Sequence, residues 1–139
     1  GKWGEDVAAR SLQSKGFEIL NRNWRCEEGE LDIVALDGKT IVIVEVRTRS
    51  SDTFRTPEES LTRQKRQHLH MAALAYLQEH DCDVSPWRID LVANDAINSG
   101  CVDRIAHSED AIEVEEVAVT VEIVLWLFLD QQPLGRRRL

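Results

Sequence analysis

The chain has few cysteines and no cysteine pair. Its three cysteines, Cys26, Cys82 and Cys101, are scattered, and none belongs to a Cys-x-x-Cys motif. An odd and sparse set argues against a disulfide framework and against a zinc site, and it is typical of proteins in a reducing compartment. We therefore expect a cytoplasmic protein.

Long hydrophobic segments and targeting signals are also missing. The longest apolar run covers residues 117–129, contains Glu122, and is too short to cross a bilayer. The first residues, from Gly1 onward, show no signal or transit pattern. We expect no membrane partner.

An excess of positive charge is absent as well. Lysine and arginine number 17 against 25 aspartates and glutamates, which gives a formal net charge of −8 and argues against a protein that coats nucleic acid. The sign reverses locally, however, because basic residues outnumber acidic ones in residues 47–70. The bases there are Arg47, Arg49, Arg55, Arg63, Lys65 and Arg66. A basic strip beside an acidic pocket suits a metal-dependent phosphodiesterase.

The hydrophobic pattern predicts one α/β domain. With 139 residues, 42% of them apolar, the chain can bury one real core but not comfortably two. Helical spacing predicts a helix over residues 3–15, ended by Gly16, and a second over residues 58–80 with Pro57 in its first turn. Period-two patterns predict strands over residues 17–25, 30–36, 40–47 and 87–93, and residues 102–106 are a further candidate strand.

The predicted third strand is apolar on both faces from Ile41 to Val44, which favours a central place in the sheet. Asp37-Gly38 predicts a hairpin turn before it. In the strand before that turn, alternation places Leu31, Ile33 and Ala35 on one face. These elements complete a domain over residues 1–112, with residues 113–139 as a C-terminal extension.

The extension contains the strictest alternation in the chain. Apolar residues recur at every second position from Val117 to Leu129, and the intervening positions are largely apolar too. A strand of this kind needs cover on both faces or a partner chain, so we expect a homodimer formed through this segment. A buried helix is the competing interpretation, and a monomer with the segment folded onto its own core is the alternative assembly.

Two acidic residues stand out around the predicted hairpin. Asp32 and Glu45 lie on either side of the Asp37-Gly38 turn at similar distances, so their carboxylates can approach each other across the two strands. The strand period places Glu45 and Arg47 on the same face. Two carboxylates can hold Mg²⁺ or Mn²⁺, which prefer oxygen ligands, and such a metal polarises a phosphate and activates water. A neighbouring cation can orient that water or stabilise charge on the phosphate.

The alternative is that Asp32 and Glu45 are solvent-facing or ion-paired strand residues. Glu45 weakens this alternative, because it follows a run of β-branched residues in a strand that is predicted to be central. A carboxylate in that position is costly unless a cation or hydrogen bonds satisfy it.

Matches to one protein family run from Gly4 to about Ala111. They include Gly29-Glu30-Leu31-Asp32, Val44-Glu45-Val46-Arg47, Pro57-Glu58, Lys65, Arg88-Ile89-Asp90 and His107. On these residues the chain resembles the YraN-like family of bacterial proteins, which are predicted endonucleases distantly related to archaeal Holliday junction resolvases.

The resemblance implies a restriction-endonuclease-like core of the PD-(D/E)xK type. Such a core is a mixed β-sheet flanked by helices, here in the order α-β-β-β-α-β. The resemblance makes Asp32 and Glu45 metal ligands, with Glu5 of the first helix nearby, and it gives Arg47 the place of a catalytic cation. Two residues depart from the family: Arg47 stands where lysine is usual, and Arg55 stands where glycine is usual. Arginine cannot give up a proton, so this departure bears on catalysis at neutral pH.

These features lead to three hypotheses about function. The first is a Mg- or Mn-dependent endonuclease that hydrolyses phosphodiester bonds in structured or branched DNA. The second is a nucleic-acid-binding module with the same fold and little catalysis, and the third is an interaction domain that recruits a protein through the apolar extension. For the first two, we expect the DNA backbone to contact Arg25, Arg49, Arg55, Arg63 and Lys65.

Overall fold

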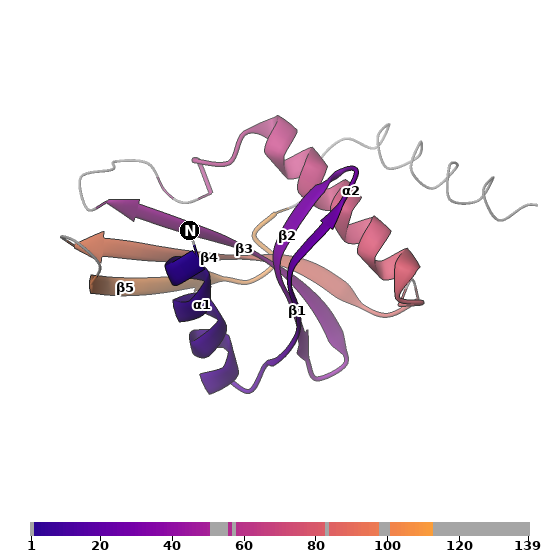
Figure 1. Cartoon of the computed structure of the whole chain (residues 1–139), viewed down its shortest axis with the longest axis horizontal. Helices are drawn as coiled ribbons and strands as arrows, with labels where there is room; N and C mark the ends of the chain where they lie inside the picture. The colour runs from indigo at the N-terminus through magenta and orange to yellow at the C-terminus, as the bar shows by residue number, and fades with distance from the viewer. Residues whose placement is uncertain (1, 51–55, 57, 83, 98–100, 113–139) are drawn as a thin grey trace, which may run out of the picture.

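A mixed five-stranded sheet forms the centre of the molecule (Figure 1). The computed structural model describes residues 2–50, 56, 58–82, 84–97 and 101–112. In chain order the elements are α1 (Lys2–Ser14), β1 (Glu18–Cys26), β2 (Gly29–Asp37), β3 (Thr40–Ser50), α2 (Arg63–Glu79), β4 (Trp87–Ile97) and β5 (Cys101–Ser108). The strands lie in sequence order, β3 and β4 are parallel, and the other neighbours are antiparallel. The α/β class and the central place of the third strand are confirmed.

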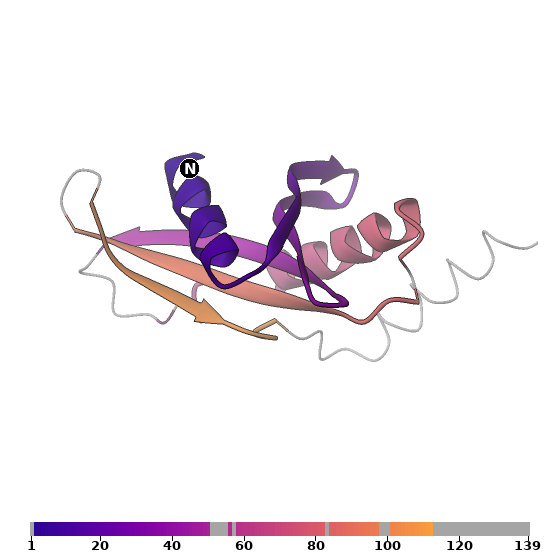
Figure 2. The same cartoon turned by 90° about the horizontal axis from the view of Figure 1, so that it is seen from below.

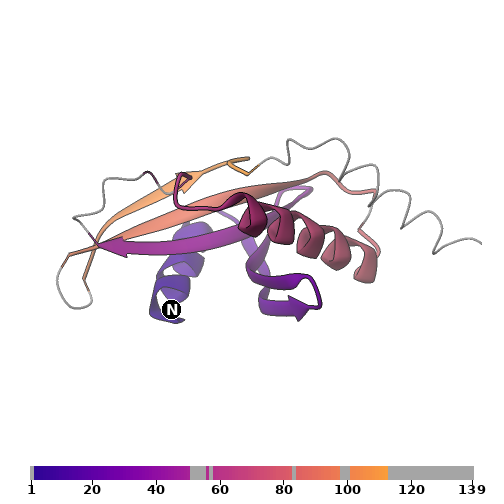
Figure 3. The same cartoon turned by 90° about the horizontal axis from the view of Figure 1, so that it is seen from above.

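The two helices pack on different faces of β3, which is apolar on both sides, and they lie over different parts of the twisted sheet (Figures 2 and 3). Val42 and Val44 pack with Ala8 and Leu12 of α1. Ile41 and Ile43 lie in the other buried cluster, with apolar residues of α2 that include Leu69, Ala72, Ala73, Tyr76 and Leu77. The crossover through α2 is what makes β3 and β4 parallel.

Glycines end α1 and turn the β2–β3 hairpin, as the sequence predicts. Gly16 has φ +92° directly after the last turn of α1, and Gly38 has φ +60° between Asp37 and Thr40, which are paired. Both angles lie in the left-handed region that favours glycine. These two turns fix the register that places the acidic residues.

The outer half of the β1–β2 hairpin leaves the plane of the sheet (Figure 2). Pairing between β2 and β3 runs from Asp37↔Thr40 to Ile33↔Val44, whereas pairing between β1 and β2 continues to Cys26↔Gly29. The freed part contacts α2, where the rings of Trp24 and Tyr76 lie 5.3 Å apart, edge to face. β2 therefore separates from β3 at Asp32.

This bend overturns the predicted faces of β2. Leu31 packs in the α2 cluster, while Ile33 and Ala35 pack in the α1 cluster. Simple alternation fails here because the strand leaves its partner between Leu31 and Ile33, so the side chains no longer share one flat surface.

The predicted start of the second helix is wrong. The second helix begins at Arg63 rather than at residue 58, because the Thr62 side chain caps it by accepting a hydrogen bond from Lys65 N at 3.1 Å. Residues 58–60 form a turn instead, and Pro57 lies outside the described residues. The candidate strand over residues 102–106 is confirmed as β5, which pairs with β4 from Leu91↔Ser108 to Ile97↔Cys101 and extends the predicted element order by one strand. The order is thus α-β-β-β-α-β-β.

The described chain ends at Ile112, which is buried in the α2 cluster. The predicted extension, residues 113–139, lies outside the described residues. Among the helices that are described, none is long and apolar enough to cross a membrane.

Candidate active site

The separation of β2 from β3 brings Asp32 and Glu45 together. Continuing the register past Ile33↔Val44 would pair Asp32 with Glu45, but the strands part there. The Asp32 side chain replaces a backbone carbonyl as the hydrogen-bond acceptor, since Val46 N donates a hydrogen bond to Asp32 Oδ2 at 2.8 Å. The site therefore forms where β2 and β3 separate, and the hydrogen bond between Val46 N and the Asp32 side chain still connects the two strands there.

Glu45 is the most buried acid of the site, with an exposed fraction of 4%. Burial and the negative charge of Asp32 raise the pKa of Glu45 to about 7, although the nearby cations oppose the shift. Those cations are Lys65 and Arg47, whose Nζ and Nε atoms each lie 3.7 Å from Glu45 Oε1. Glu45 Oε2 is buried and receives no hydrogen bond within the described part of the chain. A shared proton or a bound cation would satisfy it.

Glu5 reaches the same place from the first turn of α1. Burial raises its pKa, and the charge of Asp32 raises it further. The helix can approach because residue 4 is glycine: a Cβ there would overlap Thr48 Oγ1. The buried Asn94 fixes the approach, since its Nδ2 donates to Gly4 O at 2.8 Å. The sequence did not single out Gly4, Thr48 or Asn94 as supports of the site.

Asn23 completes the polar rim from β1. Its φ of +51° is a left-handed angle that asparagine tolerates better than most residues. With the amide turned so that its nitrogen faces the acids, Nδ2 lies 3.0 Å from Glu5 Oε2 and 3.2 Å from Glu30 Oε1. Asn23 thus ties the bent part of the hairpin to α1.

Asp32 lies close enough to both glutamates for its negative charge to raise the pKa of Glu5 and of Glu45, and we call these three carboxylates the acidic row. They do not converge as a closed cage: in the described ranges, no three His, Cys, Asp or Glu side chains surround one point as metal ligands. Mg²⁺ needs no such cage, because it is commonly held by one or two carboxylates and keeps water and substrate oxygens as its other ligands. Asp32 and Glu45, with the unsatisfied Oε2, fit that mode of binding.

The bases expected to contact DNA are dispersed. Lys65 lies at Glu45, inside the site, rather than on an open strip. Arg49 Nε lies 2.6 Å from Asp95 Oδ1, and Arg25 Nε lies 3.7 Å from Glu30 Oε2. Arg63 is exposed at the start of α2. Arg55 is outside the described residues.

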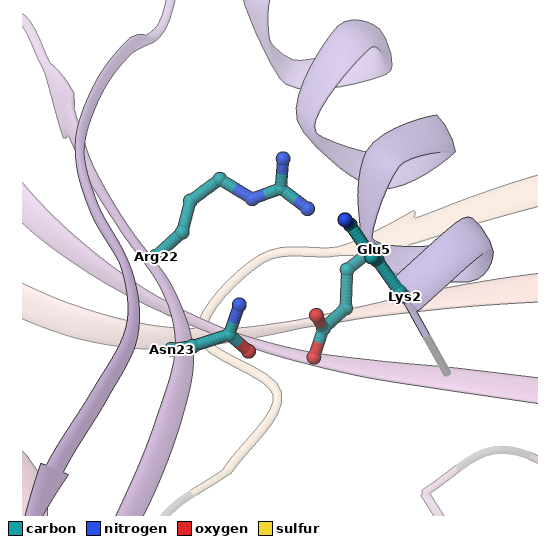
Figure 4. Close-up of a pocket in the computed structure, with 4 residues that line it drawn as sticks. All are labelled: Lys2, Glu5, Arg22 and Asn23. Atoms are coloured by element: carbon teal, nitrogen blue, oxygen red, sulfur yellow. The ribbon is translucent and has the colours of Figure 1, made fainter.

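An open pocket of about 460 Å³ adjoins the acidic row on the α1 side. It is lined by Lys2 and Glu5 of α1 and by Arg22 and Asn23 of β1, and Figure 4 shows Arg22 pointing across it toward α1. Sequence reasoning missed Lys2 and Arg22. Their separation in the sequence gives no signal, because only the packing of α1 beside β1 brings them together.

A family model matches residues 4–93, which is most of the domain just described. This chain belongs to the uncharacterised protein family UPF0102. The finding confirms the resemblance seen in the sequence.

Relatives in UPF0102 share the length of the domain. A UPF0102 protein of Beutenbergia cavernae is 48% identical over 107 residues, which cover 77% of this chain and 90% of that protein. One from Herpetosiphon aurantiacus is 44% identical over 97 residues, covering 67% and 78% respectively. Among solved structures, Pyrococcus furiosus SfsA in complex with Ca²⁺ is similar at a TM-score of 0.36 and 16% identity, over 76% of this chain and 60% of that one.

Proposed function

We propose that this UPF0102 protein is a metal-dependent nuclease that hydrolyses phosphodiester bonds in structured or branched DNA. The observation that carries the proposal is the opening of the sheet at Asp32. There a buried glutamate with an unsatisfied oxygen meets a second carboxylate, and two cations lie beside it. The topology fits the restriction-endonuclease-like core that the family resemblance implies.

In this proposal Asp32 and Glu45 hold Mg²⁺ or Mn²⁺, and Glu5 lies beside Asp32. When bound, the metal would polarise the phosphate and lower the pKa of a coordinated water. The chain's own residues supply the rest. Val46 N fixes the Asp32 carboxylate through its hydrogen bond. Arg47 and Lys65 place positive charge beside Glu45. In this proposal, that charge stabilises the negative charge that builds on the phosphate during hydrolysis.

Cleavage assays on labelled four-way junctions, flaps, duplexes and single strands, with Mg²⁺ or Mn²⁺, test the proposal. We expect the wild type to cut a branched substrate, and Asp32→Asn and Glu45→Gln each to lower the rate at least about a hundredfold, as is usual for loss of a group that stabilises the transition state. Glu79→Gln, on the exposed end of α2, is the matched control and should cut like the wild type. A wild type that cuts none of these substrates in either metal would contradict it.

A nucleic-acid-binding module is the second candidate, and Arg47 is the observation that favours it. Arginine keeps the charge beside Glu45 but cannot release a proton. If Arg47 limits catalysis, Arg47→Lys should raise the cleavage rate at neutral pH about tenfold while DNA affinity stays the same. A wild type that binds branched DNA without cutting it, and an Arg47→Lys variant that gains cleavage, would identify a binding module.

A further inference from the structure

The pocket between α1 and β1 combines bases with an acid of the candidate site. Lys2 and Arg22 line it together with Glu5 and Asn23. Glu5 is itself one of the three acids of the candidate site, so the pocket borders the acidic row at that residue. Figure 4 shows the Arg22 guanidinium and the Glu5 carboxylate reaching into this space from opposite elements.

Access to the acids differs between the two faces of the sheet. On the α2 face, Glu45 is 4% exposed and Lys65 and Arg47 lie beside it. On the α1 face, Glu5 is only half-buried and borders the open pocket. The α1 face therefore offers a backbone phosphate an opening beside Glu5.

Arg22 suits a phosphate better than any other base at this opening. Its guanidinium presents a planar set of donors that matches phosphate oxygens. In the structure Arg22 Nη2 lies 2.6 Å from Asp6 Oδ1, and the two side chains are 34% and 33% exposed. An ion pair that is open to water contributes little to stability, so Arg22 can exchange it for a stronger anion at small cost.

We propose that a backbone phosphate of the bound DNA strand occupies this pocket, where Arg22 and Lys2 hold it next to the acidic row and Asp6 is the internal competitor for Arg22. The inference rests on the proposed function, because it assumes a nucleic-acid substrate. It differs from the sequence-based expectation, which placed the backbone contacts at Arg25 and at four bases of residues 47–70.

A purely structural role for the Arg22–Asp6 pair makes a different prediction. If the pair only fastens β1 to α1, removing either partner loosens the site, and both changes weaken binding. If Arg22 binds phosphate, losing Arg22 weakens binding, but losing the Asp6 charge frees Arg22 and strengthens it. The sign of the Asp6→Asn effect therefore separates the two roles.

Anisotropy titrations of the full chain with a labelled four-way junction, at several salt concentrations, measure this sign. We expect Arg22→Gln to weaken affinity about fivefold or more and to lower the salt slope by about 0.9, the value for one lost phosphate contact on duplex DNA. Lys2→Gln should act in the same direction, and Asp6→Asn should tighten binding about twofold or more. Matched controls on exposed positions elsewhere are Arg104→Gln, Lys39→Gln and Glu79→Gln, which should stay within about twofold of the wild type.

Calorimetry with Mn²⁺ alone separates the pocket from the metal site, and Arg22→Gln should leave that isotherm unchanged. The inference is overturned if the wild type binds the junction while Arg22→Gln and Asp6→Asn both weaken binding, or while neither changes it; the proposed function survives both results. If the wild type binds no DNA even at low salt, the proposed function and the pocket assignment fall together. Thermal melting of each variant confirms that it is folded, and the variants at the exposed Lys2 and the half-buried Asp6 keep the test decisive if Arg22→Gln is unstable.

Discussion

Glu45 makes the fold sensitive to pH, because it is a buried acid with an unsatisfied oxygen. Its pKa is about 7 in the folded chain and near 4.5 when the chain is unfolded. Between these values the folded state holds a proton that the unfolded state has released. Stability therefore falls as pH rises through this window, and it levels off above pH 7.

Glu45→Gln should abolish that loss of stability. Each pKa unit corresponds to about 1.4 kcal/mol, so the variant should gain up to about 3 kcal/mol over the wild type between pH 5 and pH 8 in the presence of a chelator. Urea unfolding at several pH values measures the difference, with the exposed Glu79→Gln as a control that should follow the wild type. Parallel stability curves for Glu45→Gln and the wild type would show that Glu45 is not buried as described.

At the residue scale, the sequence predicted the contact between residues that one turn joins and missed the contact that only packing creates. Asp32 and Glu45 flank a single hairpin, so counting from Gly38 was enough to bring them together. Lys2 and Arg22 meet only because α1 packs beside β1. No local rule of period or spacing contains that contact.

At the scale of the elements, α1 packs so closely against the sheet at Gly4 that no larger side chain fits there. A Cβ on Gly4 would overlap Thr48 Oγ1, and its next neighbours would be Asn94 Nδ2 at 3.4 Å and Thr48 Cβ at 3.7 Å, which are ordinary contacts. The hydroxyl of Thr48 is thus the single atom that excludes alanine at position 4. Because Glu5 follows directly, this close approach also sets the position of the Glu5 carboxylate.

Gly4→Ala should therefore push the start of α1 away from β3. We expect a loss of about 1–3 kcal/mol, the usual range for overpacking, together with weaker Mn²⁺ binding because Glu5 moves. Thr48→Ala removes the clashing atom, so Gly4→Ala combined with Thr48→Ala should be more stable than Gly4→Ala alone. Chemical denaturation of the four proteins in this double-mutant cycle measures the coupling. Purely additive effects would contradict the described contact.

Element types followed from the sequence better than element ends and faces did. Alternation and helical spacing predicted α1 and the strands β1 to β4, and Gly16 and Gly38 marked their turns. The start of α2 was missed because the Thr62 cap outweighs Pro57 as a start signal. The faces of β2 were missed because alternation assumes a partner strand along the whole length, and β2 loses β3 at Asp32.

At the scale of the whole molecule, the last described residues, up to Ile112, are held against the sheet and its core. Asp110 N donates to the buried Asp90 and Ala111 N donates to Ile89 O, both at 2.9 Å, and Ile112 is buried against the α2 cluster. His107 Nε2 also lies 2.8 Å from Asp90 Oδ2. These contacts fasten the chain just before the extension.

A chain that ends at Ile112 should therefore keep its fold, whereas one that ends at Ser108 should lose several of these contacts and unfold more easily.

We propose that residues 117–129 pair with a second chain. We therefore expect light scattering to give a dimer for the full chain and a monomer for residues 1–112. A dimer also suits a branched substrate, since two sites related by a twofold axis address two strands symmetrically. A full chain that is monomeric would rule out this assembly, and a dimeric residues 1–112 would place the interface elsewhere.

The central claim is that the acids at the opened sheet bind a divalent cation. Calorimetric titration with Mn²⁺, at a pH above 7 where Glu45 is ionised, tests it directly, comparing the wild type with Asp32→Asn, Glu45→Gln and the Glu79→Gln control. We expect one saturable site in the wild type and the control, with affinity reduced at least about tenfold in both site variants, as loss of a charged ligand implies. Four indistinguishable isotherms, or no heat in the wild type, would contradict the claim.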